Sequence, residues 1–412
     1  MRNIIFYFPY RGVGGVSLLF KRLSSLLTNR FNVYLVDFVD GFMGRSISES
    51  VNFIDIETVI TYPSNSIVVF QSIPSWNIID ACKFPAETRI LFWNLHPLNL
   101  YPNIFSIYTS NKLKKKVAKA LLWISFFRKR RLEKLVEYLN KKNAIFFMDG
   151  ENFKKTSEFY PRVNFQRRFL PIFSNPGRLV EHTPKEQLRC CWIGRIVDFK
   201  VHILGHLIER LDSAISNVGP IELIIVGNGD SYDDLMHYVR EVSSLKITLI
   251  DEVHADELDS FLSERVDIQF AMGTSALEAA SKGVPTFLLD YSFVKISGLY
   301  CFQYIYEASD YSVGEEIDIS KLEKKSSLEE KLLKCRRDYR NIGLKTYEYW
   351  RANFSPEFVE SEFIHMVNLS TATIGEMRDL GFFRPDIISL VVKKTLLKLK
   401  KTKQAIHGFG EC

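Results

Sequence analysis

The sequence predicts an α/β protein built from two doubly wound, Rossmann-like domains that face each other across a cleft. Short apolar strands alternate with helices over residues 1–174 and again over residues 187–352. Alternation of this kind is typical of a parallel sheet with helices on both faces, because each parallel connection needs a crossover. Residues 175–186 are polar and contain two prolines, which is typical of a linker between the two series.

The composition is that of an ordinary soluble globular protein. The chain has 412 residues, which is too long for one typical core, with 46% apolar and 25% charged residues. Its six cysteines show no Cys-x-x-Cys spacing, so we expect reduced thiols and no zinc site. We see no secretory leader pattern and no apolar run long enough to span a bilayer. The expected location is therefore the cytoplasm.

The first series begins with a strand at residues 3–8, followed by a glycine-rich turn that contains Gly14 and Gly15. Apolar residues then recur at helical spacing between residues 16 and 27. This is a strand–turn–helix unit of the kind that opens a doubly wound domain. Further apolar runs predict buried parallel strands at residues 32–36, 67–70, 90–93 and 144–148.

The second series places glycine turns at the ends of consecutive strands. One strand ends at Gly194 and the next ends at Gly227. Ligands of such sheets bind beyond the carboxyl ends of the strands, so we expect the site in a cleft between the domains. The predicted strands are residues 189–193, 221–226 and 247–250, and the predicted helices are residues 201–211, 231–242 and 255–263.

A third glycine turn, in residues 268–290, has the strongest features of a ligand site. A strand at residues 268–272 stops at Gly273, and Thr274 and Ser275 are predicted to be N-cap residues of a short helix at residues 276–281. Gly283 is predicted to end this helix before a strand at residues 286–289. The turn directs free backbone N–H groups and hydroxyls at one point, where a phosphate would bind well. An ordinary βαβ unit with a capped helix is the alternative.

Three charged residues near these turns suit a nucleotide. Arg195 and Lys200 flank the first turn, where they could bind a diphosphate and stabilise its charge as it leaves. Glu278 lies one helical turn beyond Thr274, and a carboxylate there suits the hydroxyls of a ribose. The alternatives are a solvated turn for Arg195 and Lys200 and a helix-dipole partner for Glu278.

Three motifs at residues 194–200, 224–229 and 277–285 together resemble the nucleotide-sugar domain of GT-B glycosyltransferases, most closely those of bacterial lipopolysaccharide, O-antigen and capsule synthesis. The resemblance implies that Arg195 and Lys200 bind the donor diphosphate and that Glu278 binds the ribose. Residues 353–367 resemble the C-terminal helix that crosses back to the first domain, ahead of a basic tail that ends at residue 412. We also expect the glycine turns and their neighbours to contact the donor, namely Gly14, Gly15, Gly194, Gly227, Gly273, Thr274 and Ser275.

The sequence departs from the family pattern at Phe270 and in the turn Gly273-Thr274-Ser275, which replaces the usual Gly-Phe-Gly-like loop. Retaining members have a second Glu eight residues before the ribose-binding one, and Phe270 stands there, so the contact to the donor sugar and the stereochemical outcome stay open. The chain also has no Asp-x-Asp pair, the usual divalent-metal ligands of the other glycosyltransferase fold. We therefore expect a metal-independent enzyme with no cofactor, in which cations and a helix N-terminus neutralise the diphosphate.

The acceptor side offers three candidates for proton handling, each after a predicted strand of the first domain. His96 has the right intrinsic pKa for proton transfer near neutrality, and it is our catalytic candidate together with Arg195 and Lys200. Asp149 and Glu151 are the other two candidates. The alternative for His96 is a simple turn residue before a proline.

Basic charge is concentrated in two segments. Residues 111–142 contain twelve Lys and Arg against two Glu, and residues 391–403 contain six Lys and no acid. Both segments also carry apolar residues, a composition typical of helices that bind an anionic membrane surface. Nucleic acid is the rival partner, but no nucleic-acid-binding fold accompanies the charge.

These features predict a peripheral membrane enzyme on the inner face of the cytoplasmic membrane. It would transfer a sugar from a nucleotide-diphosphate sugar to a hydroxyl of a lipid-linked saccharide in cell-surface polysaccharide synthesis. Two alternatives stay open: a nucleotide-sugar epimerase of the same fold, and a non-catalytic scaffold that binds nucleotide sugars. The epimerase has no need of the basic apolar segments, and Phe270 is the feature that favours the scaffold.

Overall fold

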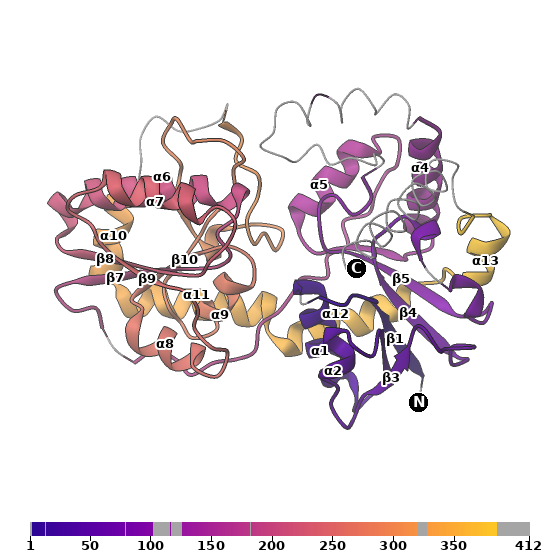
Figure 1. Cartoon of the computed structure of the whole chain (residues 1–412). Helices are drawn as coiled ribbons and strands as arrows, with labels where there is room; N and C mark the ends of the chain where they lie inside the picture. The colour runs from indigo at the N-terminus through magenta and orange to yellow at the C-terminus, as the bar shows by residue number, and fades with distance from the viewer. Residues whose placement is uncertain are drawn as a thin grey trace, which may run out of the picture.

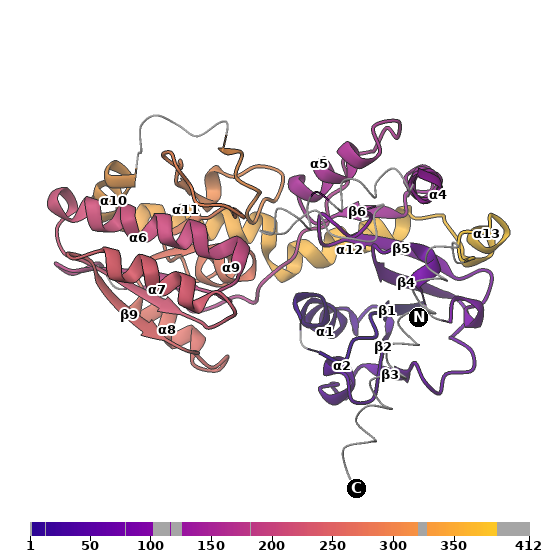
Figure 2. The same ribbon diagram turned by 45° about the horizontal axis from the view of Figure 1, so that its top comes forward.

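The computed structural model describes residues 2–12, 14–78, 80–101, 116, 126–181, 183–319 and 328–384. Within these residues the chain forms two six-stranded sheets, each covered by helices on both faces (Figures 1 and 2). The predicted fold class, an α/β protein of two doubly wound domains, is therefore confirmed. None of the described helices is both long enough and apolar enough to cross a bilayer.

The first sheet has the strand order β3-β2-β1-β4-β5-β6, and all of its neighbours are parallel. Its residues alternate between two cores, as the pleat of a strand requires. Ile4 and Phe6 pack under α1, whereas Ile5 and Tyr7 pack under α4 on the other face. The elements of this domain are β1 (Asn3–Tyr7), α1 (Gly15–Leu27), β2 (Asn32–Asp37), α2 (Phe42–Arg45), β3 (Asn52–Asp55), β4 (Ser66–Gln71), η1 (Ser75–Asn77), η2 (Ala81–Lys83), β5 (Arg89–Asn94), α4 (Phe126–Lys141), β6 (Ile145–Phe147) and α5 (Gly150–Phe159).

The second sheet has the order β12-β11-β10-β7-β8-β9 and is parallel except for its edge strand β12. Helices α6 and α10 cover one face, and α8 covers the other. The elements of this part are β7 (Leu188–Ile193), α6 (Asp198–Val218), β8 (Ile221–Val226), α7 (Tyr232–Glu241), β9 (Lys246–Ile250), α8 (Leu258–Arg265), β10 (Ile268–Ala271), α9 (Thr274–Ala280), β11 (Thr286–Leu288), β12 (Gln303–Tyr304), η3 (Ile305–Glu307) and α10 (Leu328–Arg337).

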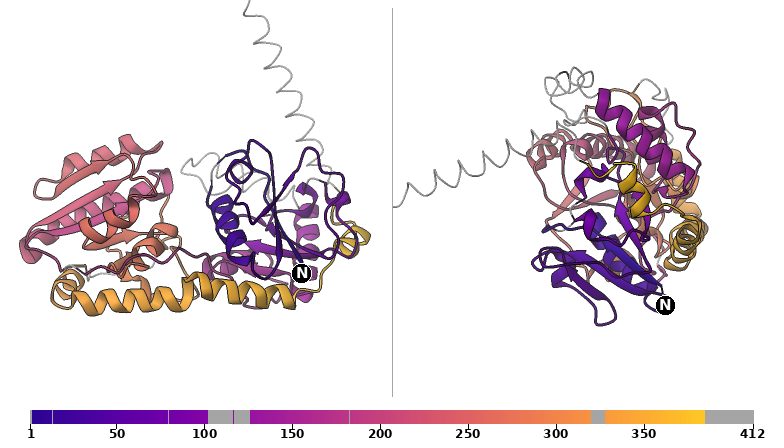
Figure 3. Two further views of the ribbon diagram at one scale, coloured as in Figure 1. Left: turned by 90° about the horizontal axis from the view of Figure 1, so that it is seen from below. Right: turned by 90° about the vertical axis from the view of Figure 1, so that its right-hand side faces the viewer.

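Two long helices near the C-terminus connect the domains. Helix α11 (Tyr339–Phe354) packs on α9 of the second domain, and α12 (Pro356–Leu369) packs on α1 of the first. They meet at Ser355, whose side chain accepts the N–H of Phe358 and so caps α12, with Pro356 in the first turn. Figure 3 shows this pair of helices running along one side of both domains. Helix α12 overlaps the segment predicted to cross back, and the short α13 (Ile374–Asp379) follows it on the first domain.

Every predicted strand is present, and its ends differ from the prediction by no more than one residue. The helices differ more. Helix α6 continues seven residues past Leu211, because Ala214 and Val218 extend its buried stripe as far as Gly219. The strands β3 and β12, which were not predicted, are short strands at sheet edges. Of the two basic segments, residues 391–403 and most of residues 111–125 lie outside the described residues.

Candidate functional site

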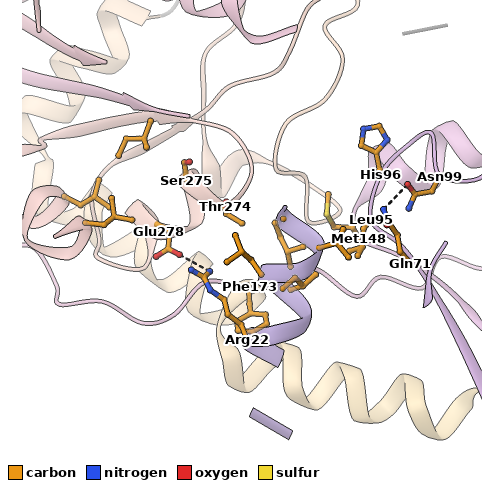
Figure 4. Close-up of a pocket in the computed structure, with 18 residues that line it drawn as sticks. Arg22, Gln71, Leu95, His96, Asn99, Met148, Phe173, Thr274, Ser275 and Glu278 are labelled. Carbon is orange, nitrogen blue, oxygen red and sulfur yellow. Dashed lines mark hydrogen bonds and ion pairs between the residues drawn. The ribbon is translucent and has the colours of Figure 1, made fainter. Parts of the chain in front are cut away.

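A cavity of about 510 Å³ lies between the two domains at the carboxyl ends of the strands. Figure 4 shows side chains from both domains around it, with Glu278 at one end and His96 well separated from it at the other. Five of the predicted site residues line this one cavity: Gly15, His96, Thr274, Ser275 and Glu278. The remaining lining is mostly apolar: Val16, Leu18, Leu19, Arg22, Gln71, Leu95, Asn99, Met148, Ile172, Phe173, Ile193, Leu258 and Leu262.

The turn before α9 has the predicted strand–glycine–helix geometry but not the predicted cap. Gly273 itself is the N-cap residue, with φ +64° and ψ −144°, a conformation that only glycine adopts readily. Thr274 and Ser275 therefore occupy the first two helical positions, and no side chain caps the helix. The prediction that Thr274 and Ser275 are N-cap residues is wrong, because the chain enters the helix one residue earlier than its helix-forming residues suggest.

Glu278 lies between two cations. Arg22 on α1 donates from Nη1 to Glu278 Oε1 at 3.1 Å, and the ammonium of Lys282 lies 4.0 Å from Oε2. The carboxylate side chain is 14% exposed, so both ion pairs are only partly screened by water. Neither Arg22 nor Lys282 was predicted. Helical spacing could have identified Arg22, because Gly15, Leu18 and Arg22 follow one another at intervals of three and four residues on the face that lines the cavity.

Arg195 and Lys200 lie together at the first strand-end turn, outside the lining of this cavity. A Cβ built on Gly194 would lie 3.4 Å from Lys200 Nζ, so the lysine folds back over the turn. Burial, and then the positive charge of Arg195, lower the pKa of Lys200. Neither cation has an ion-pair partner within the described part of the chain. Two neighbouring cations without an acid are an arrangement that favours an anion.

The glycines of the second turn, Gly227 and Gly229, are required by the backbone. Gly227 has φ +138°, and a Cβ there would lie 2.0 Å from the carbonyl oxygen of Gly194. The N–H of Gly194 in turn donates to Val226 at 3.0 Å. The same close packing recurs between Gly229 and Ile196. Gly194 and Gly227 therefore hold the two turns together, whether or not a ligand also contacts them.

Gly14 and Gly15 open α1 beside the cavity. Gly14 is the N-cap residue, with an extended backbone, and its N–H donates to the hydroxyl of Ser17 at 3.1 Å. Gly15 is the first helical residue, and it lines the cavity with no side chain of its own. The turn therefore presents backbone to the cavity at this point.

The imidazole of His96 has a fixed tautomer in this arrangement. Its Nδ1 accepts the backbone N–H of Leu98 at 3.1 Å, so the neutral ring carries its proton on Nε2. Burial lowers the pKa of the ring, which favours this neutral form. Asn99, which lines the same wall, accepts a hydrogen bond from Gln71 at 3.3 Å. His96 is thus a hydrogen-bond donor in this arrangement.

Asp149 and Glu151 are buried and lie outside the lining of this cavity. Asp149 is the N-cap residue of α5, where it accepts the N–H of Asn152 at 2.8 Å. Burial raises the pKa of Asp149 to about 6 and that of Glu151 to about 7. Asp149 therefore has a clear structural role, and neither carboxylate is placed where a cavity ligand would meet it.

Phe270 is a core residue of β10. Its ring stacks on Phe287 with a centroid distance of 4.9 Å, and its side chain is fully buried. The strand register explains this position, since Phe270 pairs with Trp192 of β7 in the middle of the sheet. The side chain is not part of the cavity lining. Within the described residues, no group of three or more His, Cys, Asp and Glu side chains is arranged to bind a metal ion.

Neither a protein-family model nor a curated protein matches the chain. Solved structures do. The lipopolysaccharide outer core galactosyltransferase WaaB aligns with a TM-score of 0.51 and 10% identity over 89% of this chain and 99% of its own. Anabaena Alr3699/HepE, solved in complex with UDP and glucose, aligns with a TM-score of 0.50 and 10% identity over 89% of this chain and 100% of its own.

Other matches are to proteins of different kinds or lengths. The N-terminal domain of Candida albicans trehalose-6-phosphate phosphatase aligns with a TM-score of 0.51 and 11% identity over 90% of this chain and 97% of its own. The chain spans only 58% and 55% of two matching TarM chains, one of them from S. aureus, with TM-scores of 0.41 and 0.44. The chain thus has the two-domain fold of the GT-B glycosyltransferases.

Proposed function

We propose that this protein is a glycosyltransferase that moves a sugar from a nucleotide-diphosphate sugar to a hydroxyl of a lipid-linked saccharide. The observation that carries the proposal is the cavity between the domains, which has Glu278 and the α9 turn at one end and His96 at the other (Figure 4). A donor and an acceptor can meet in such a cavity with the nucleotide held by one domain and the reacting sugar near the other.

The second domain supplies the groups that suit the donor. Glu278 would accept hydrogen bonds from the ribose hydroxyls. Arg195 and Lys200 would bind the diphosphate and stabilise the charge that develops on it as its bond to the anomeric carbon breaks. Their lack of acidic partners within the described residues supports this role. We propose that these cations act without a metal ion.

The first domain supplies the groups that suit the acceptor side. His96 would donate from Nε2 to an oxygen of the donor sugar or of the acceptor. With its proton on Nε2 the neutral ring cannot also accept the proton of the attacking hydroxyl, so a base role requires Nδ1 to lose its bond to the Leu98 N–H. The proposal therefore assigns His96 to positioning of the reacting groups.

Two of the similar solved structures support nucleotide-sugar chemistry, one through its described activity and one through its bound ligand. WaaB is described as a galactosyltransferase of the lipopolysaccharide outer core, and HepE was solved with UDP-glucose. Both are 10% identical to this chain in sequence.

The proposed test is transfer from a panel of nucleotide-diphosphate sugars to lipid-linked acceptors, with product analysis in the presence and absence of acceptor. We expect a glycosylated product with one donor, and a steep loss of turnover, about 100-fold, in Arg195→Ala. Arg240→Ala removes an exposed arginine from α7 and is the matched control. Normal turnover in Arg195→Ala with an unchanged melting temperature would refute the assignment of the diphosphate site.

The same test separates the alternatives. A changed sugar in the absence of acceptor would identify an epimerase. Nucleotide binding without any product across the panel would identify a non-catalytic scaffold.

The proposal includes a membrane contact at the start of α4. Phe127 is 82% exposed, and it lines one groove with Arg130, Lys134 and Leu380, which is 57% exposed. Exposed apolar tips among cations suit the boundary of an anionic bilayer. We propose that this face, together with the basic segments 111–142 and 391–403, places the enzyme on the inner face of the cytoplasmic membrane.

Sedimentation with vesicles tests this contact. We expect binding to vesicles that contain phosphatidylglycerol, with a loss in Phe127→Ser and at high salt. Ile60→Ser removes another exposed apolar side chain and is the control. Equal sedimentation of Phe127→Ser and the wild-type protein would exclude this face.

A further inference from the structure

Glu278 receives one cation from each domain. Lys282 belongs to the same domain as Glu278, and its buried ammonium is held in place by Asp259 of α8 at 2.7 Å. Arg22 comes from α1 of the first domain, 256 residues away in the sequence, and it donates to Glu278 Oε1 at 3.1 Å. Figure 4 shows the guanidinium and the carboxylate pointing toward each other. Of the two cation contacts to Glu278, only the one from Arg22 bridges the cleft.

The two cations have different consequences for the carboxylate. Lys282 is 1% exposed and also donates to the backbone oxygen of Glu278, so it stays beside α9 whatever the first domain does. Arg22 is 34% exposed, and it has no other ion-pair partner within the described ranges. Lys282 would therefore stay beside Glu278 after Arg22 had left.

We propose that the Arg22–Glu278 ion pair is an autoinhibitory contact that closes the nucleotide site of the ligand-free protein. The inference rests on the proposed function, because it takes the ribose of a nucleoside diphosphate as the ligand of Glu278. The guanidinium and the ribose hydroxyls are donors that compete for the same carboxylate oxygen. A nucleotide therefore binds more tightly once α1 and α9 have separated at this point.

The size of the effect follows from the exposure of the pair. A single ion pair with a partly exposed partner is weak, so the contact should reduce nucleotide affinity by about two- to fivefold. Salt should weaken the contact further. The contact therefore regulates the site without preventing its use.

The experiment measures the affinity of UDP, GDP and ADP by calorimetry in the full chain, in Arg22→Gln and in Arg22→Lys. We expect Arg22→Gln to bind the preferred diphosphate about two- to fivefold more tightly than the wild-type protein and Arg22→Lys to lie between them. Arg30→Gln is the matched control, because Arg30 makes a comparable pair with Glu360 on α12, at 3.0 Å, but does not line the cavity. A spin-label distance between the domains should increase in Arg22→Gln and stay unchanged in Arg30→Gln.

The outcomes separate the two proposals. Unchanged or weaker diphosphate binding in Arg22→Gln, with normal binding by the wild-type protein, overturns the autoinhibitory contact and leaves the donor site intact. The absence of binding by every variant, including the wild-type protein, overturns the proposed function and with it the ligand that this contact excludes. Tighter binding in Arg22→Gln together with a longer interdomain distance supports the contact.

Discussion

A single backbone contact determines which nitrogen of the neutral His96 ring carries the proton. The N–H of Leu98 occupies Nδ1, which leaves Nε2 to carry the proton of the neutral ring. The ordinary pKa of histidine suggests a base, and the sequence alone cannot exclude one. His96 lines the predicted cleft, but the tautomer of its neutral ring favours a hydrogen-bond donor there and not a base.

Replacement of His96 tests this assignment. We expect His96→Ala to reduce kcat about 10- to 100-fold because a hydrogen-bond donor is lost, and His96→Gln, which keeps a donor, to retain more activity. Steady-state kinetics of both variants across pH give the comparison. If His96 were instead the general base, both variants would lose activity equally and the acidic limb of the pH profile would disappear.

At the scale of elements, the strand ends could be predicted because most of the strands are buried apolar runs that stop at a turn residue. The pairing of β7 with β8 and β10 also follows from the rules for parallel sheets. The contact between Arg22 and Glu278 could not be predicted, because it joins helices of two domains whose relative placement no local pattern encodes. The N-cap at Gly273 was missed for a local reason: Thr and Ser are better caps than Gly on average, but only Gly accepts this backbone conformation readily.

The turns that join β7 and β8 to their helices give a prediction on stability. Gly227→Ala should lower the free energy of unfolding by about 3 kcal/mol or more, since the new Cβ would clash with the Gly194 carbonyl in a left-handed conformation. Denaturant unfolding measures the change. Gly15→Ala is the control, because a Cβ at that helical position meets no atom within 4 Å, and it should be neutral or slightly stabilising. A loss of less than 1 kcal/mol in Gly227→Ala would contradict the close packing of the two turns.

At the scale of the whole molecule, the domains meet at a second place besides the cavity. The N–H of Gly150 at the start of α5 donates to the backbone of Asp310 at 2.8 Å, and Lys155 pairs with Glu316 at 3.1 Å. Arg167 also pairs with Asp310. Glu151 is buried beside this interface, and burial raises its pKa from 4.5 to about 7. The charged groups that act on Glu151 are Lys154, Lys155, Asp149 and Glu315.

The raised pKa of Glu151 predicts that the free energy of unfolding depends on pH. Between about pH 4.5 and 7 the folded protein keeps a proton on Glu151 that the unfolded chain has released, so stability falls as the pH rises through this range. The loss is on the order of 2 kcal/mol. Glu151→Gln cannot ionise and should flatten the curve of unfolding free energy against pH. Glu158→Gln, at an exposed position of the same helix, is the control, and an unchanged slope in Glu151→Gln would contradict the raised pKa.

The chain passes between the domains twice, once ahead of β7 and once at the joint between α11 and α12. Two covalent crossings define a line, and a rigid body fastened at two points of a line can turn only about that line. The joint at Ser355 and Pro356 interrupts the helical hydrogen bonds at one of these points, because proline has no N–H to donate. Rotation about this axis would change the separation of Arg22 and Glu278. A nucleotide that binds at Glu278 would therefore rotate the two domains apart about this one axis.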